Sequence, residues 1–251
     1  FAMRCEGAIR LGAVLTAPSA IWNVAIGTVR VVFEDQPTPV SFSDVFNPQV
    51  SFEVVGRVDN VVEFVNIQIL NLAVEGFSTV VAHHTLSVTN VYLLGTAIFV
   101  NGVVSGSAFV ITSSQFAQTC QFANWTWLAA TQFAIDNSTF AGAVTVADSQ
   151  AANAVVWTWH ASTFAATVTI ARTTVNTLVV YRFIACVFRA SYVVTATTFV
   201  NTPLEYLNSD FNVTYTTAVA VPNDLVCAIC YLDASTVSGG SVTYSGSSIY
   251  A

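Results

Sequence analysis

Lysine is absent from this chain of 251 residues, and charged side chains of all kinds make up only 8% of it. Soluble domains carry about 25% charged residues, so the surface of this protein is unusually poor in charge. Its seven basic residues are all arginines, spread from Arg4 to Arg189 without a cluster, and the net charge is −7. Binding to a nucleic-acid backbone needs clustered Lys or Arg. The composition therefore excludes nucleic acid as a partner.

Long uninterrupted apolar runs are also missing, although 54% of the residues are hydrophobic. A membrane-spanning helix needs about 20 consecutive apolar residues. The best candidate, residues 11–29, is interrupted by Pro18, Ser19 and Asn23. Elsewhere the apolar residues are interleaved with Ser, Thr and Asn at short period, which is typical of strands. We therefore predict an all-β chain without a transmembrane segment.

The apolar residues also recur with a longer and regular period. The octapeptides FVITSSQF (109–116), FAIDNSTF (133–140), WTWHASTF (157–164) and YRFIACVF (181–188) start at equal intervals, and LEYLNSDF (204–211) follows one residue sooner. Every copy ends in Phe, and every copy has a bulky apolar residue at its first and third positions. Ser occupies the third position from the end, except in the copy that has Cys186 there. A second apolar segment follows each octapeptide, so one unit holds two or three short strands.

A unit of this size cannot bury its apolar residues alone, but it can bury them against the next unit. The repeat therefore predicts a single-stranded parallel β-helix, or β-solenoid, with about 24 residues per coil, a length within the range of known repeat architectures. Like residues would lie about 4.8 Å apart along its axis. We expect Phe133, Ile135 and Phe140 to face inward and Asp136 and Asn137 to lie at a turn. A β-sandwich is the alternative fold, because its strands also recur about every 8–12 residues.

This pattern resembles the right-handed parallel β-helix of the pectate-lyase-like superfamily. The resemblance covers roughly residues 60–220, and it rests on coil length and inward ladders, with no catalytic motif matched. It implies long stacked parallel sheets, and handedness is carried over from the family. We predict a solenoid over residues 38–250, with the clearest repeats at 85–217. Residues 1–37 show no clean copy of the unit and are predicted to be an N-terminal cap or assembly arm.

Many solenoids of this family cleave acidic polysaccharides with clustered carboxylates. Asp136 and Asp148 lie on different sides of one coil, and Glu205 and Asp210 lie about three coils away. Hydrolysis by two carboxyl groups needs separations of about 5–10 Å, which this layout does not obviously supply. We assign no catalytic residue, no metal site and no cofactor. Whether the chain is an enzyme stays open, with a non-enzymatic role favoured.

Several residues are nevertheless candidates for glycan binding. Arg172, Arg182 and Arg189 fall within one coil of each other and could hold an anionic sugar, although a solvated or ion-paired surface is the alternative. Trp125 could stack on a sugar ring if it faces outward, although core packing is the alternative. His160 occupies the turn position of Asp136, and we expect it to be structural.

Cysteines and glycosylation sequons bear on the location of the protein. Among five cysteines, Cys227 and Cys230 form a Cys-x-x-Cys pair, for which we favour a local disulfide or two separate thiols. A zinc site would need a second pair at matched spacing. Asn-x-Ser/Thr sequons make three asparagines candidates for glycosylation, namely Asn124, Asn137 and Asn212. With the scarcity of charge, they favour an extracellular or cell-surface location.

Two classes of function follow from these observations. Outward positions carry Ala, Thr, Val and Ser, as in residues 165–167, and such weakly hydrated faces invite contact with other chains or a coat of glycans. The first hypothesis is a non-enzymatic extracellular structural protein that assembles with copies of itself into a filament, sheath or surface coat. The alternative is a carbohydrate-active β-helix, either a polysaccharide lyase or hydrolase or a glycan-binding module, that uses the face of Arg172 to Arg189.

Overall fold

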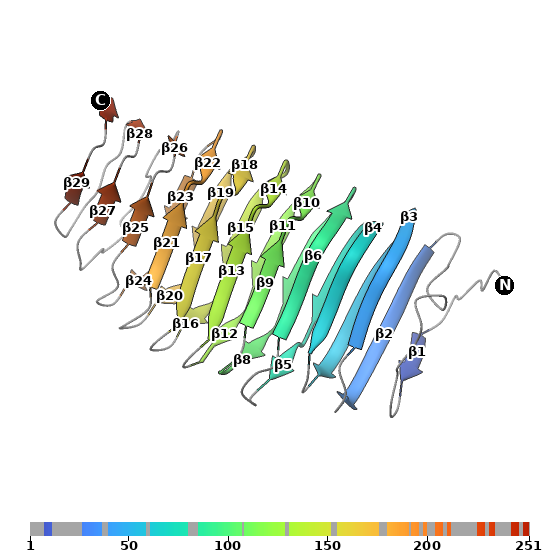
Figure 1. Ribbon diagram of the computed structural model, residues 1–251. Coiled ribbons are helices and arrows are strands. Elements are labelled where there is room, and N and C mark those ends of the chain that lie inside the picture. Colours follow the sequence, from blue (N-terminus) through green and yellow to red (C-terminus); the bar gives the residue numbers. More distant parts are fainter. Residues whose placement is uncertain are drawn as a thin grey trace.

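All the strands that the structure describes pair in parallel and stack along one axis (Figure 1). The computed structural model describes residues 8–11, 27–36, 40–58, 61–79, 85–106, 108–128, 131–151, 155–175, 180–190, 192–195, 198–199, 204–207, 210–211, 225–228, 231–233, 242–245 and 248–250. The strands of these residues belong to two sheets that run along the solenoid, one of 24 strands and one of six strands.

A regular coil contains four strands in succession, and in the three coils nearest the C-terminus the structure describes the first two of them. The first strands of the coils are β9 (Ala108–Thr112), β13 (Gln132–Asp136), β17 (Val156–His160), β21 (Val180–Ile184), β25 (Leu204–Leu207), β27 (Leu225–Ala228) and β29 (Val242–Ser245). The second are β10 (Gln115–Phe116), β14 (Thr139–Phe140), β18 (Thr163–Phe164), β22 (Val187–Phe188), β26 (Asp210–Phe211), β28 (Tyr231–Asp233) and β30 (Ser248–Tyr250). The third are β7 (Ala97–Val100), β11 (Cys120–Ala123), β15 (Val144–Ala147), β19 (Val168–Ala171) and β23 (Tyr192–Thr195). The fourth make up the six-stranded sheet: β5 (Ser78–Thr79), β8 (Val103–Val104), β12 (Thr126–Trp127), β16 (Gln150–Ala151), β20 (Thr174–Val175) and β24 (Thr198–Phe199).

The strand register confirms the repeat that the sequence predicts. Phe109 pairs with Phe133, Phe133 with Trp157, Trp157 with Tyr181, and Tyr181 with Leu204, all in parallel. About five coils, about 24 residues apart, form this regular part. Every pairing between described strands is parallel, so the protein is a parallel β-solenoid. The alternative of a β-sandwich is wrong, because its sheets would be built from antiparallel neighbours.

Longer strands continue the stack toward the N-terminus. They are β2 (Gly27–Gln36), β3 (Val40–Val58), β4 (Val62–Glu75) and β6 (Thr85–Leu93), and the short strand β1 (Ala8–Leu11) precedes them. β1 pairs with β2, β2 with β3, β3 with β4, and β4 with β6, again in parallel. β1 and β2 lie within the predicted cap or assembly arm, whose role stays a prediction.

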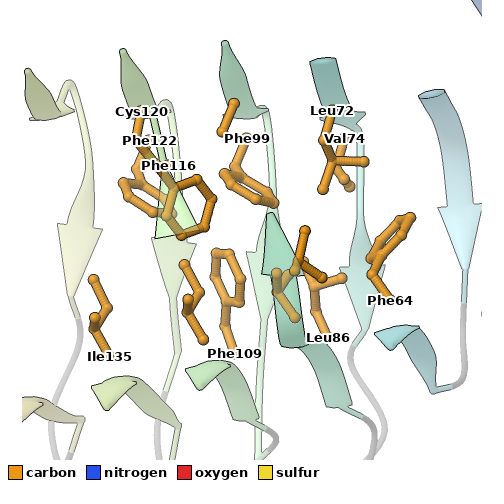
Figure 2. Close-up of a cluster of buried hydrophobic side chains, with 14 of the residues drawn as sticks. Phe64, Leu72, Val74, Leu86, Phe99, Phe109, Phe116, Cys120, Phe122 and Ile135 are labelled. Atoms are coloured by element: carbon orange, nitrogen blue, oxygen red, sulfur yellow. The ribbon is translucent and has the colours of Figure 1, made fainter. Parts of the chain in front are cut away.

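Aromatic ladders fill the interior of the coils. Phe116, Phe140, Phe164 and Phe188 are buried one above another, with successive ring centroids 4.7, 5.1 and 4.8 Å apart. This distance is close to the spacing of neighbouring strands, so in-register pairing alone brings the rings into contact. Figure 2 shows part of the same interior, in which Phe99, Phe109 and Phe122 lie against one another. Phe133, Ile135 and Phe140 are buried, which confirms their predicted inward orientation.

Helices are absent from the described residues, and no segment among them could cross a membrane as a long apolar helix.

Candidate functional site

A single residue in the left-handed conformation forms each of two corners of the coil. At the first corner, which lies between the first and second strands of a regular coil, these residues have φ between 45° and 57°, and they are Asp44, Asn66, Asn90, Ser113, Asn137, Ala161 and Ala185. At the second corner they are Asn101, Asn124, Asp148 and Arg172. Asn and Asp enter this conformation most readily among residues with a side chain, which explains their frequency here. The predicted turn at Asn137 is confirmed.

A column of buried hydroxyl groups lies directly inside the first corner. Ser114, Ser138 and Ser162 each donate a hydrogen bond to the carbonyl of the residue two positions earlier, over 2.8–2.9 Å. The backbone N–H of Ser114 in turn donates to Ser138 Oγ, and that of Ser138 donates to Ser162 Oγ, both over 3.1 Å. The side chain of one coil thereby satisfies a buried N–H of the coil before it, which would otherwise be costly.

Exposed polar side chains form a second set of ladders outside the corners. Hydrogen bonds link Asn90 to Asn66 (2.8 Å) and Asn66 to Asp44 (3.2 Å). At the second corner, Asn124 donates to Asn101 (3.1 Å), which donates to Glu75 (3.2 Å). Each of these two ladders therefore runs along the solenoid axis over three successive coils.

In later coils, acidic side chains pair with a His or an Arg at the corners or beside them. His160 Nδ1 lies 2.6 Å from Asp136 Oδ1, next to the first corner. Asp136 and His160 are in-register neighbours on β13 and β17, so the ladder itself brings them together. The contact fits the expected structural role of His160.

Arg172 forms a two-pronged ion pair with Asp148 at the second corner. Its Nε and a terminal nitrogen lie 2.5 and 2.7 Å from the two carboxylate oxygens. The hydrogen bond from Arg172 lowers the pKa of Asp148, and the same bond raises the pKa of Arg172 above its usual value. Both groups are exposed to solvent, so water screens their attraction and the pair adds little to stability.

The three arginines predicted as glycan-binding candidates occupy three different segments of the coil. Arg172 lies at the second corner, Arg182 lies in β21, and Arg189 follows β22. Arg182 is half-buried, and its in-register neighbours are Thr158 and Glu205. Arg189 is exposed, and its backbone N–H donates to the carbonyl of Phe164. Glycan binding by these residues stays a prediction.

Trp125, the predicted sugar-stacking candidate, lies in the core. It is 0% exposed, its Nε1 donates to the carbonyl of Phe99 over 2.8 Å, and its ring lies 5.9 Å from that of Trp127. A Cβ added to Gly102 would clash with the indole, so the ring occupies space that this glycine leaves open. The left-handed corner at Asn124 turns both tryptophans inward, and Trp125 offers no surface to a sugar.

Two of the three predicted glycosylation sites are described, and both are exposed. Asn124 and Asn137 lie at left-handed corners, where their side chains point into the outer polar ladders. Asn212 lies outside the described residues, as do Cys230 and the side chain of the other disulfide candidate, Cys227. Glycosylation and the disulfide stay predictions.

The two described thiols, Cys120 and Cys186, are buried, and neither forms a disulfide. Burial raises the pKa of Cys120 well above its usual value, and it raises that of Cys186 to about 11. The thiolate is the reactive form, so we expect neither thiol to react with iodoacetamide at pH 8 in the folded protein. Mass spectrometry of the labelled peptides would test this residue by residue.

A variant with Ala161→Cys supplies the matched control for this labelling, because position 161 is exposed at a corner. The introduced thiol should react quickly in the folded protein, and all thiols should react after denaturation. Labelling of Cys120 or Cys186 in the native state at the rate of the control would contradict the burial.

Within the described part of the chain, no three His, Cys, Asp or Glu side chains come together as a group that could hold a metal ion. The polar side chains of this part are arranged in regular rows, namely the ladders at the corners and the outward-facing columns of the strands. Sequence reasoning missed the ladder of Asp44, Asn66 and Asn90, although these residues recur at intervals of 22 and 24 positions. It also missed two exposed rings, Phe46 and Tyr92.

Comparisons of the chain with protein-family models, with curated proteins and with solved structures find no match. The parallel strand pairing and the register of the repeat therefore carry the assignment as a parallel β-solenoid by themselves.

Proposed function

We propose that this protein is a non-enzymatic structural subunit that assembles side by side with copies of itself at the cell surface or outside the cell. The observation that carries the proposal is the chemistry of three outward columns in the regular coils. They consist of Gln115, Thr139, Thr163 and Val187, of Gln121, Thr145 and Thr169, and of Thr126, Gln150 and Thr174. None of these side chains is charged, and all are exposed or half-exposed.

Charge in these coils lies elsewhere, chiefly at the corners, in pairs such as Asp148 with Arg172. Covering such columns buries no charge, and Thr and Gln can replace their lost contacts with water by hydrogen bonds to the same residues of a second copy. A second copy presents the same columns at the same spacing of about 4.8 Å. Two such faces match row for row, as a self-complementary contact requires.

The exposed sequon asparagines support a location outside the cell, because glycosylation takes place in the secretory pathway. Asn124 and Asn137 lie at corners, where a glycan would project away from the flat faces. The alternative of a carbohydrate-active solenoid that uses Arg172, Arg182 and Arg189 remains a second hypothesis.

Electron microscopy and sedimentation velocity of the purified protein test the assembly. We expect ordered filaments, sheets or oligomers that dissociate on dilution. A Thr145→Lys variant places a charge on the outward column, so we expect its assembly to weaken by about tenfold or more, because a buried unpaired charge is costly.

The matched control is Ala161→Lys, which adds the same charge at an exposed corner and should leave assembly unchanged. Both variants should keep the unfolding midpoint of the parent. Dispersed monomers of the parent at every concentration would rule out the proposal, and so would equal effects of the two lysines.

A further inference from the structure

Two exposed aromatic rings lie in line on the N-terminal half of the solenoid. Phe46 is 68% exposed and Tyr92 is 38% exposed, which places them among the few large apolar side chains at the surface of the described residues. Phe46 pairs in register with Gln68, Gln68 with Tyr92, and Tyr92 with Gln115. The column therefore alternates ring and amide along the axis, and its two rings are two strand spacings apart, or about 10 Å.

The outer polar ladder of the first corner lies beside this column. Asp44, Asn66 and Asn90 each stand two residues before a member of the column, and they are joined by hydrogen bonds of 3.2 and 2.8 Å. An amide has two N–H donors and a carbonyl acceptor, and the ladder uses one donor of each asparagine. Donors and acceptors therefore remain along the edge of the ring column.

Rings alternating with amides, flanked by a polar ladder, have the chemistry of a carbohydrate-binding surface. Aromatic faces pack on the C–H faces of sugar rings, and planar amides bind hydroxyl groups from the side. Asp44 is the one charged residue of the column and its ladder, so a neutral sugar fits better than a uronate. The column also differs from the arginine face considered above.

We propose that the column of Phe46, Gln68, Tyr92 and Gln115 binds a neutral, extended β-1,4-linked glycan that runs parallel to the solenoid axis. In such a glycan alternate sugars present the same face, and the disaccharide repeat is close to the distance between the two rings. Phe46 would stack on one sugar, and Tyr92 would stack on the second sugar beyond it. Leu70, itself exposed, widens the apolar strip. Beyond Gln115 the column continues as Thr139 and Thr163, so the ring-bearing part ends there.

Sedimentation of the intact protein with insoluble cellulose, chitin and amylose tests the proposal. We expect binding to cellulose or chitin and none to amylose, whose helical chain does not present sugars in a straight line. Comparison of cellulose with chitin shows which of the two glycans the column prefers, because these polymers differ in the substituent at C2 of each sugar. Calorimetry with the matching soluble hexasaccharide then gives the affinity.

Variants connect the binding to the two rings. Phe46→Ala and Tyr92→Ala should each weaken affinity for the hexasaccharide by about tenfold, as expected for the loss of one stacking contact. Tyr92→Phe keeps the ring and should bind like the parent. The matched control is Val156→Ala, which removes from β17 an apolar side chain about as exposed as that of Tyr92 and should have no effect.

Failure of the parent to bind either β-linked polymer would overturn the proposal, and so would equal losses in Val156→Ala and the ring variants. Sedimentation velocity of Phe46→Ala supplies the remaining check. Dissociation of an oligomer without a change in glycan affinity would show that the rings contact a second copy instead. Gln115 belongs both to the ring column and to one of the assembly columns, but Phe46 and Tyr92 belong to none of the assembly columns. Thr145 lies in a separate outward column, that of Gln121 and Thr169, so this proposal and the proposed assembly can fail separately.

Discussion

Replacing Phe140 with alanine is expected to destabilise the folded protein by about 3–5 kcal/mol, as for other buried Phe→Ala substitutions. Its ring is stacked between those of Phe116 and Phe164, at centroid distances of 4.7 and 5.1 Å, and all three are buried. Removal of the ring leaves a cavity between the rings of Phe116 and Phe164, and the paired strands on either side hold these two rings in place. Such walls cannot collapse easily, which places the cost toward the upper part of the range. Urea denaturation followed by tryptophan fluorescence would measure it.

Thr139→Ala provides the matched control, because the neighbouring side chain on the same short strand points outward and is exposed. Its effect should lie within about 0.5 kcal/mol, as is usual for surface positions. A loss of less than about 1 kcal/mol in Phe140→Ala would contradict the stacked interior, because it falls well short of the range for buried rings.

The sequence predicts the interior of the regular coils well, because each coil places apolar side chains at the same positions of its strands. Phe109, Phe133 and Trp157 occupy the same place in successive repeats, and a parallel ladder is the arrangement that brings such residues into contact. Stacking then needs no knowledge of distant parts of the chain. The same argument holds for the Ser column, whose small side chains fit the tight space inside the corner.

The outward orientation of Phe46 and Tyr92 could not be predicted from alternation alone. Strict alternation from Phe42 would place Phe46 inside, and strict alternation from Leu86 would place Tyr92 inside as well. The left-handed residues Asp44 and Asn90 interrupt the strand and reset this pattern, so Val45 and Val91 turn inward in their place.

The same reset explains the burial of Trp125. Phe122 and Trp127 both face inward, yet an odd number of steps along the chain separates them, so alternation cannot run unbroken from one to the other. The orientation of the indole between them is therefore ambiguous, and the corner at Asn124 removes the ambiguity. A signal was present in the sequence, because Asn or Asp recurs at the corner positions. This recurrence of Asn and Asp predicts which side chains face inward only when the alternation is counted anew from each corner.

Removal of the buried hydroxyl at position 138 is expected to cost about 1–3 kcal/mol, the penalty for leaving one buried N–H unsatisfied. In Ser138→Ala, the N–H of Ser114 loses its acceptor, because Ser138 Oγ lies 3.1 Å from that nitrogen. The carbonyl of Asp136 keeps a second donor, the N–H of Ser113 at 3.0 Å, so the loss falls mainly on one group. Urea denaturation would measure the free energy of unfolding.

Hydrogen exchange of the Ser114 amide distinguishes this cause from a general loosening of the coil. In Ser138→Ala this amide should lose protection more than its neighbours do, because it alone has lost its acceptor. Ser138→Cys is the matched variant, since Cys186 occupies the same column and its sulfur donates to the carbonyl of Trp159. Because sulfur is a weak donor and acceptor, we expect an intermediate cost. Unchanged stability and unchanged exchange at Ser114 in Ser138→Ala would show that packing alone holds the corner, and that the hydroxyl column contributes nothing to it.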